Sequence, residues 1–464
     1  MELNNKIDEL REQIISDTQE LLKIRSIEDV AVDGAPFGDG VGKALECALN
    51  MADKLGFETT NLDGYVGYAE YGQGEDYVAV LGHLDVVPEG DGWIYPPYAA
   101  EIHDSKIYAR GALDDKGPMV AALYGLKAVK ELGLPLSKRV RVIFGTNEET
   151  GCGEMKYYLS KEKPPVSGFT PDADFPIIFA EKGIASFNVV KELNEKCTGD
   201  VCIKSIYGGQ RPNMVPDYCE AVVYAKSVEG IINYVKEFSS ETGFTIEAQE
   251  CCDKHVTIKS YGVSAHGSTP ELGKNAIMQM FSLLNRVEME QCDIKDFIKF
   301  FSEKIGMDTT GKDIGINLHD EASGDLTLNV GTIHTNDDKI VMSLNVRYPV
   351  TFKLEDMFLP LNGKLESTGI RVEDMVHQNP LYYPKNHPLI QSLQKVYKEQ
   401  TGEEPTLLAI GGGTYAKEMP NIVAFGPIFP GKPDLDHQAN EYIEVEDLIL
   451  SSKIYAHAIY ELAK

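Results

Sequence analysis

Short apolar runs and stretches of helical periodicity alternate in the first part of the chain. Tyr77–Leu81 (YVAVL) is short, apolar and rich in β-branched residues, which predicts a buried parallel strand. Lys116–Leu134 carries apolar residues at helical spacing with a proline in its first turn, and Arg139–Gly151 reads as a strand that runs into acidic residues. This alternation predicts a doubly wound α/β domain.

The pattern changes between Ile184 and Gln378. Strands of alternating polarity, such as HVTIKSYGVSAHG and DLTLNVGTIHT, are mixed there with amphipathic helices such as GKNAIMQMFSLLNRVE. This mixture predicts an α+β domain with an antiparallel sheet. Beyond it the α/β pattern returns, and a helix from about Glu446 to Ala463 closes the chain. We therefore expect residues 184–378 to form a domain inserted into a first domain made of residues 1–183 and 379–464.

Composition and charge are those of a soluble globular protein, with 43% hydrophobic and 25% charged residues. The net charge of −28 argues against nucleic acid or an anionic membrane as a partner, because both would be repelled. The N-terminus carries charges throughout and resembles no signal peptide, and no apolar stretch is long enough to span a membrane. The eight cysteines form no C-x-x-C pair, which favours reduced thiols. These features predict a cytoplasmic protein.

Two polar residues stand just beyond the first buried strand. His83 and Asp85, in LGHLDVVP, follow the YVAVL run. Ligands of open α/β sheets bind at the carboxyl ends of the strands, so a site is one interpretation. A buried histidine oriented by a nearby aspartate is also an ordinary structural pair, so the motif by itself leaves both interpretations open.

Further acidic and histidine residues follow other segments of the first domain. They are Asp114 and Asp115 in RGALDDKGP, Glu148 and Glu149 in NEETGCGE, Asp172 and Asp174 in TPDADFP, and His437 in PDLDHQANEYI. Taken singly, they read equally well as helix caps, solvated turn residues or an ordinary histidine. Taken together, imidazoles and carboxylates without thiolates are a ligand set for zinc, manganese or cobalt. Five such ligands with one shared carboxylate make two adjacent metal positions, and a second carboxylate beside a ligand supplies a base.

Six motifs carry a resemblance to a known family: GHLDVVP, RGALDDKGP, NEETGCGE, PDADFPIIFAEKG, SAHGSTPELGKNA and LDHQANEYI. In this order they resemble the di-zinc peptidase family that contains carnosinases, acetylornithine deacetylase and succinyl-diaminopimelate desuccinylase. The resemblance covers about residues 5–460 and is strongest to the bacterial dipeptidase V (Xaa-His dipeptidase) branch. It implies an α/β catalytic domain with a mixed, mostly parallel sheet, and an inserted α+β lid domain with an antiparallel sheet.

The resemblance also implies a set of metal ligands. They are His83 and Asp172 on one divalent ion, Glu149 and His437 on the other, and Asp114 bridging the two. We choose Asp114 over Asp115 because relatives keep the aspartate that precedes x-Lys-Gly. The cis peptide that follows the bridging aspartate in the family then falls between Asp114 and Asp115. Zinc is the first expectation for both ions, with manganese or cobalt as alternatives.

Two acidic residues would act beside these ligands. Glu148 would be the general base, and Asp85 would hold His83 in the tautomer that faces the metal. The position of Asp172 separates subgroups of the family. Its peptidases generally carry aspartate there, whereas its deacylases and carboxypeptidases tend to carry glutamate, so Asp172 favours a peptidase.

The inserted domain would supply groups that recognise the substrate. The resemblance implies that His266, in SAHGSTP, donates to the oxyanion formed during the reaction. Asn213, in GGQRPNMVP, and Arg347, in LNVRYPV, match substrate-binding positions, and an arginine suits a bidentate grip on a terminal carboxylate. Without the resemblance, a structural histidine and a surface ion pair are the alternatives for His266 and Arg347.

The glycine run AIGGGTYAK lacks both common phosphate-loop patterns, so nucleotide binding is not expected. Gly411, Gly412 and Gly413 would instead let main-chain N–H groups approach the substrate, as the family's matching loop does. Cys152, three residues after Glu149, is interpreted as a small buried residue, with a redox role as the alternative.

The function predicted from these motifs is that of a metal-dependent dipeptidase. It would hydrolyse short peptides with a free amino terminus by attack of a metal-bridging water activated by Glu148. The insertion of about 200 residues matches the branch in which the lid domain replaces a partner subunit, which favours a monomer. The alternatives are an N-acyl amino acid deacylase or desuccinylase, and a non-catalytic metal- or peptide-binding protein. A base beside a complete ligand set argues against the last, because a binding module needs no positioned base.

Overall fold

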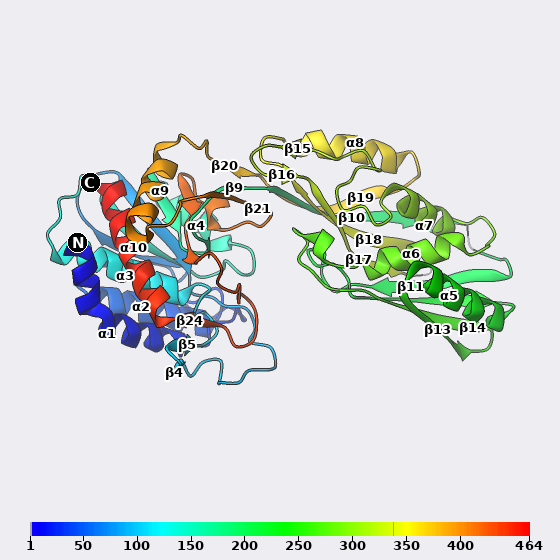
Figure 1. Cartoon of the computed structure of the whole chain (residues 1–464), viewed down its shortest axis with the longest axis horizontal. Coiled ribbons are helices and arrows are strands. Elements are labelled where there is room, and N and C mark those ends of the chain that lie inside the picture. The colour runs from blue at the N-terminus through cyan, green and yellow to red at the C-terminus, as the bar shows by residue number, and fades with distance from the viewer. Residues whose placement is uncertain (1, 196, 337) are drawn as a thin grey trace. The chain divides into compact units, whose positions relative to one another are not determined.

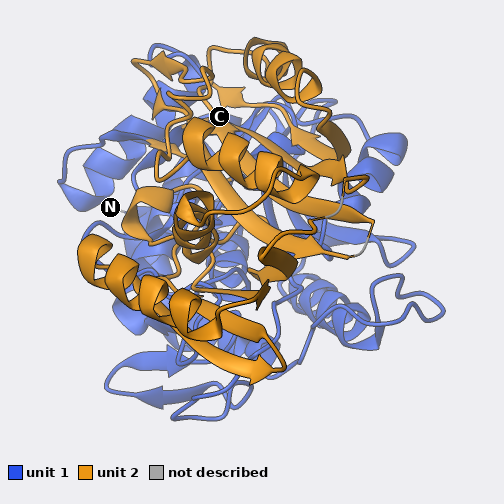
Figure 2. Cartoon of the chain, turned by 90° about the vertical axis from the view of Figure 1, so that its right-hand side faces the viewer, with its two compact units in different colours: residues 1–179, 383–408, 413–464 blue, residues 180–382, 409–412 orange. Residues whose placement is uncertain are grey.

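The computed structural model describes residues 2–195, 197–336 and 338–464, and it divides into two compact units (Figures 1 and 2). The first unit contains residues 1–179, 383–408 and 413–464. The second contains residues 180–382 and the short segment 409–412. The glycine run is therefore shared: Gly411 and Gly412 belong to the second unit and Gly413 to the first.

A mixed sheet forms the centre of the first unit. Its strand order begins β1-β2-β6-β3-β7-β22, in which β6, β3, β7 and β22 are parallel and β1 and β2 run antiparallel to their neighbours. Every residue of β3 is buried, as the YVAVL run predicts for a central parallel strand. The bounds are β1 Glu58–Leu62, β2 Val66–Tyr71, β3 Tyr77–His83, β6 Arg139–Gly145, β7 Ser167–Thr170 and β22 Ile422–Ala424.

Helices α1, α3, α9 and α10 pack together on this unit, and Figure 1 shows α1, α3 and α10 side by side. Helix α3 contacts α1, α10 and the central strands, so nearly its whole length is buried. Gly125 permits the close packing, because an added Cβ would lie 2.9 Å from the main-chain nitrogen of Ala456 in α10. The bounds are α1 Glu2–Leu22, α2 Asp39–Lys54, α3 Lys116–Glu131, α4 Gly153–Lys161, α9 Pro388–Thr401 and α10 Val445–Ala463.

A small antiparallel sheet, in the order β24-β5-β4, joins distant parts of the first unit. Its pairing of Tyr442 with Tyr108 brings the segment after His437 beside the segment that leads to Asp114. The remaining short elements are β4 Glu101–His103, β5 Lys106–Tyr108, β24 Tyr442–Glu444, β8 Ala173–Asp174, β23 Pro427–Ile428 and the 3-10 helix η2 Tyr415–Lys417. Strands β9 Ile177–Glu181, β20 Leu381–Tyr382 and β21 Leu407–Ile410 lie where the chain passes from one unit to the other.

An eight-stranded antiparallel sheet forms the second unit, in the order β13-β14-β12-β11-β17-β18-β10-β19. Its strands are β10 Gly183–Glu192, β11 Val201–Gly208, β12 Tyr218–Ala225, β13 Thr245–Cys252, β14 His255–Tyr261, β17 Thr327–Thr335, β18 Lys339–Tyr348 and β19 Arg371–Gln378. Its helices are α5 Val228–Thr242, α6 Ala276–Arg286, α7 Asp293–Lys304 and α8 Leu354–Glu366, with the short η1 Pro270–Leu272, β15 His319–Asp320 and β16 Gly324–Asp325. Apolar residues of the sheet and of all four helices share one core.

The two sheets confirm the predicted fold class, an α/β domain with a mixed sheet and an α+β domain with an antiparallel one. The strand expected over residues 139–151 ends at Gly145, and the acidic residues lie in the turn beyond it. Within the described residues, no helix has both the length and the apolar character needed to cross a membrane.

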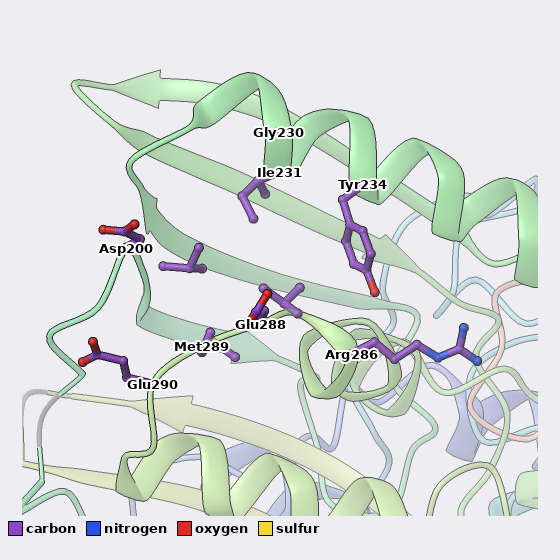
Figure 3. Close-up of a pocket in the computed structure, with 10 residues that line it drawn as sticks. Asp200, Gly230, Ile231, Tyr234, Arg286, Glu288, Met289 and Glu290 are labelled. Carbon is purple, nitrogen blue, oxygen red and sulfur yellow. The ribbon is translucent and has the colours of Figure 1, made fainter.

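A cavity of about 770 Å³ lies in the second unit. Figure 3 shows its lining residues between the start of α5 and the segment that follows α6. It is lined by Asp200, Val201, Gly230, Ile231, Tyr234, Arg286, Val287, Glu288, Met289 and Glu290. None of the site residues predicted from the sequence is among them. The predicted metal ligands all belong to the first unit.

Candidate metal centre

Parallel strands deliver several of the predicted ligands to one edge of the sheet. Strand β3 ends at His83, which pairs with Gly145 at the end of β6. Glu148 and Glu149 lie in the turn after β6, and Asp172 follows the end of β7. Because β6, β3 and β7 are parallel neighbours, the residues after their carboxyl ends gather at the same edge.

Two imidazoles approach different oxygens of the Asp114 carboxylate. His83 Nε2 lies 2.8 Å from Asp114 Oδ1 and 3.9 Å from Asp172 Oδ1. His437 Nε2 lies 3.2 Å from Asp114 Oδ2 and 3.0 Å from Glu149 Oε2. The structure therefore brings the five predicted ligands together, with Asp114 between the two histidines.

Two overlapping groups of potential ligand atoms are close enough to hold a cation. One consists of His83, Asp114 and Glu149, and the other of His83, Glu148 and Asp172, with all ligand atoms of a group within 4.8 Å of one another. Glu148 thus lies in the same cluster as the ligands. Its distance from them suits either a ligand or a base that acts next to the metal.

Unpartnered buried atoms show that these residues fit a metal. Among the described residues, His83 Nε2 and Glu149 Oε1 are buried and make no hydrogen bond. Buried polar atoms normally have a partner, because leaving one unpaired costs about 1–3 kcal/mol. Imidazole and carboxylate groups that converge at these distances suit zinc, manganese or cobalt. The cluster therefore fits the two divalent ions that the sequence predicts.

The carboxylates of this cluster repel one another. Burial and then the charge of Asp172 raise the pKa of Glu148 well above its ordinary value. Burial and the charge of Asp114 raise the pKa of Glu149 to about 7. Burial opposes ionisation of Asp114 as well, but the two imidazoles outweigh it and hold the Asp114 pKa below its usual range. Divalent cations would relieve this repulsion, which is a second reason why the residues fit them.

Comparison with known proteins decides the family. Residues 79–461 match the family model described as Peptidase family M20/M25/M40. This chain belongs to that family. It is a metallopeptidase, as the motifs predict.

Relatives and solved structures match this peptidase over nearly its whole length. It is 44% identical over 460 residues, 98% of each chain, to "Putative dipeptidase YtjP" of Bacillus subtilis (strain 168). Among solved structures, the aminoacylhistidine dipeptidase from Vibrio alginolyticus has a TM-score of 0.59 at 12% identity and covers 97% of this chain and 96% of its own. Human carnosine dipeptidase 1 has a TM-score of 0.57 at 16% identity, with 99% of both chains covered. At these identities the two structures show a shared fold.

Asp85 of the peptidase acts through different atoms from those that the sequence suggests. His83 Nδ1 lies 2.9 Å from the main-chain carbonyl oxygen of Asp85, whereas the Asp85 carboxylate is 3.6 Å away. The two carboxylate oxygens accept hydrogen bonds of 3.1 Å from the main-chain N–H groups of Glu148 and Glu149. A proton on Nδ1 donated to the carbonyl leaves Nε2 free to bind a metal. The carboxylate of Asp85 instead holds the turn that carries Glu148 and Glu149.

The neighbouring aspartates Asp114 and Asp115 have different partners. Asp114 faces the imidazoles, while Asp115 Oδ2 accepts a hydrogen bond of 3.2 Å from the main-chain N–H of His83. The peptide bond between them is cis, as the family resemblance implies. Gly82 makes room for this arrangement, because a Cβ there would overlap the Asp115 carboxylate. The geometry supports the choice of Asp114 as the shared ligand.

His266 and Asn213 lie together in the second unit. His266 Nδ1 is 2.6 Å from Ser268 Oγ, and the N–H of Gly267 donates to the main-chain oxygen of Asn213 at 2.7 Å. Gly411 belongs to the same group, because a Cβ on it would lie 2.6 Å from the Ser268 Cβ. The predicted oxyanion donor His266 and two predicted substrate-binding residues, Asn213 and Gly411, are thus neighbours within this unit.

Arg347 joins this group through Gly411. Its Nη1 donates to the Gly411 carbonyl oxygen at 2.9 Å and its Nε to Asn345 Oδ1 at 2.8 Å. The side chain is 4% exposed, and burial lowers the Arg347 pKa to about 10. In the described part of the chain no carboxylate lies within 4.0 Å of its guanidinium. A buried guanidinium that bonds only to neutral oxygens suits an anionic ligand.

Two buried acidic residues beside the site, Glu154 and Glu441, were not predicted from the sequence. Glu154 accepts hydrogen bonds from the Tyr415 hydroxyl and, at 3.1 Å, from the main-chain N–H of Asn147. Glu441 is fully buried beside the segment that ends at Asp114. Both lie inside motifs quoted for the family, NEETGCGE and LDHQANEYI. The sequence did contain a signal for them. Each is an acidic residue without a role in a motif whose metal ligands are already assigned.

Proposed function

We propose that this peptidase is a dipeptidase that binds two divalent metal ions and hydrolyses short peptides with a free amino terminus. The observation that carries the proposal is the Asp114 carboxylate, faced by His83 and His437 through separate oxygens, with Glu148 beside them. The names of full-length relatives point to the same activity.

Five side chains would hold the ions: His83 and Asp172 one of them, Glu149 and His437 the other, and Asp114 both. When bound, the two ions would polarise the scissile carbonyl and lower the pKa of the attacking water. Zinc is the first candidate, and manganese and cobalt suit the same ligands.

Glu148 would take the proton from the attacking water and deliver it to the leaving amino group. Its main-chain N–H is bonded to Asp85 Oδ1, and the N–H of Glu149 is bonded to Asp85 Oδ2. The two glutamates are thereby held in a fixed relation to each other. This allows one to remain a ligand while its neighbour moves a proton.

Residues of the second unit would recognise the substrate. Arg347 would bind the terminal carboxylate, because its buried guanidinium bonds only to neutral oxygens among the described residues. His266 would donate to the oxyanion, and Asn213 would bind the peptide. Gly411, Gly412 and Gly413 would present main-chain N–H groups. We further propose that the chain acts as a cytoplasmic monomer, with the second unit serving as its own lid.

Hydrolysis of a small substrate panel tests this function. The panel contains Leu-Ala, β-Ala-His, N-acetyl-Leu-Ala and N-succinyl amino acids, assayed after removal of metal with EDTA and after addition of Zn²⁺ or Mn²⁺. We expect metal to restore cleavage of the free dipeptides alone. Cleavage of only the acylated compounds would make the enzyme a deacylase, and no cleavage with any metal would contradict a catalytic role.

A further inference from the structure

Glu441 is a buried carboxylate that touches the segment leading to Asp114. It lies four residues after His437 and directly before β24, and its side chain is fully buried. The pairing of β24 with β5 places it beside residues 110–114, more than 300 positions earlier in the chain.

The Glu441 carboxylate accepts four hydrogen bonds from this one segment. Its Oε2 accepts from Arg110 Nη1 at 2.7 Å and from the Gly111 N–H at 3.1 Å. Its Oε1 accepts from the N–H groups of Leu113 at 2.8 Å and Asp114 at 3.2 Å. Three of the four donors are main-chain amides, and the last belongs to the residue whose side chain faces both imidazoles.

The loop from His437 to Glu441 is anchored on its other side as well. Asn440 Oδ1 accepts from the Ile94 N–H at 2.6 Å, and Asn440 Nδ2 donates to the Gly92 carbonyl at 3.1 Å. His437 and Asn440 both have positive φ angles, of 64° and 65°, so the loop is a compact turn. The His437 side chain itself is 56% exposed, so packing does little to hold it.

We propose that Glu441 is a positioning residue of the metal centre. It ties the main chain of Asp114 to the loop that carries His437, and so sets the distance between two ligands of one ion. A carboxylate suits this position because both of its oxygens are acceptors and every neighbour is a donor. This inference rests on the proposed two-metal function and adds a residue to it.

The affinities for the two ions should depend on Glu441 to different extents. His83 is held by strand β3 and by the carbonyl oxygen of Asp85, and Asp172 by the segment after β7. His437 is held mainly by the loop that Glu441 anchors. Loss of Glu441 therefore affects the ion of Glu149 and His437 more than the ion of His83 and Asp172.

A metal titration of Glu441→Gln tests the proposal without any substrate. A glutamine would point its NH₂ group at the N–H donors of residues 110–114 and break part of the contact. The full chain is stripped with EDTA and titrated with Co²⁺, followed by visible absorption and by calorimetry. We expect the parent to bind Co²⁺ in two steps. In the variant, the affinity of one step should fall about 10- to 100-fold, while the affinity of the other stays close to the parental value.

Two further variants make the result specific. Glu441→Asp keeps an acceptor-only carboxylate, so it should restore part of the lost affinity, and it carries the test if Glu441→Gln does not fold. Glu70→Gln is the matched control, because Glu70 forms the same kind of carboxylate–arginine pair, with Arg141 at 2.5 Å and Arg139 at 3.0 Å, on strand β2 of the same unit. We expect both binding steps of the control to stay parental.

The outcomes separate this inference from the proposed function. Parental affinity for both ions in Glu441→Gln, or equal weakening of both, would overturn the role of Glu441. A parent that binds fewer than two ions would overturn both proposals. A parent that binds two ions but cleaves no dipeptide would contradict only the proposed reaction, and the Glu441 result would stand.

Discussion

At the scale of the residue, chemically identical neighbours have different partners. Asp114 faces two imidazoles while Asp115 accepts from the main chain of His83. Glu149 lies 3.0 Å from His437, whereas Glu148 is grouped with His83 and Asp172. Position in the site, set by the main chain, gives neighbouring carboxylates different partners, and the proposed roles as metal ligand or base follow from those partners.

Substitution of the neighbouring acids should separate metal binding from catalysis. Glu148→Ala is expected to lower kcat by at least about 100-fold while metal content stays near two ions per chain, because it removes only the base. Asp114→Ala should lose both metal and activity, since it removes the shared ligand. Metal analysis and kcat measured on the same preparations give the comparison. A near-parental rate for Glu148→Ala would show that the base is another residue.

Arg347 offers a second prediction at this scale. Arg347→Met should reduce kcat/KM for a free dipeptide about 100-fold, from loss of about 3 kcal/mol of a buried ion pair with the substrate. A dipeptide C-terminal amide should be a poor substrate for the parent and should not become worse with the variant. The control is Arg371→Met, because Arg371 is an exposed arginine that pairs with Glu192 at 2.6 Å on the surface of the same unit. A uniform loss on acid and amide would contradict carboxylate recognition.

At the scale of the element, buried acidic side chains accept hydrogen bonds from the main chain of the turn between β6 and α4. Asp85 accepts both main-chain N–H groups of Glu148 and Glu149, and Glu154 at the start of α4 accepts the N–H of Asn147. These acceptors fix both ends of the turn. Glu148 and Glu149 are therefore held in place although they lie outside any strand or helix. The arrangement costs stability, because two carboxylates are buried.

This cost predicts a pH dependence of stability. Burial, together with the charge of Asp85, raises the pKa of Glu154 to about 7, although its hydrogen bond from Tyr415 opposes the shift. A carboxyl whose pKa is raised on folding destabilises the protein as pH rises above its unfolded value of about 4.3. Relative to Glu154→Gln, the parent should therefore lose stability between about pH 4.5 and 7, by about 3 kcal/mol in all.

Urea unfolding of the metal-free proteins at several pH values between 5 and 8 measures this difference. Glu162→Gln serves as the control, because Glu162 ends the same helix and pairs with Arg141 at 2.9 Å. A pH dependence found for Glu154→Gln and absent from this control would assign the dependence to Glu154. A Glu154→Gln difference that is constant with pH would show that Glu154 does not titrate there.

At the scale of the whole molecule, the second unit interrupts the first in sequence and supplies its own core and sheet. His266, Asn213, Arg347 and Gly411 are neighbours within it. The proposed ligands all belong to the first unit. One chain thus contains both proposed sets of groups.

Complementation tests whether one chain is sufficient. We expect a mass near 51.3 kDa by light scattering. Mixtures of His266→Ala with Glu148→Ala should stay inactive, because in a monomer neither chain can lend its intact residue to the other. Activity restored by mixing would show that the histidine comes from a partner subunit.

The sequence by itself determined the fold class and predicted the cluster of candidate ligands. Strand β3 and helix α3 follow from local hydrophobic periodicity, which a short window of sequence contains in full. His83, Glu149 and Asp172 follow the ends of parallel strands, and such ends meet at one edge whatever the details of the loops. The gathering of these residues could therefore be predicted without coordinates.

Only the tertiary structure decided which atoms support the ligands. Asp85 meets His83 through its carbonyl and the Glu148–Glu149 turn through its carboxylate, a division that no motif states. Glu441 reaches Asp114 across more than 300 residues because β24 pairs with β5 in one particular register. Contacts of this kind depend on how distant loops pack. Hydrophobic periodicity and motif spacing describe only residues that are close in sequence, so they cannot predict contacts between distant loops.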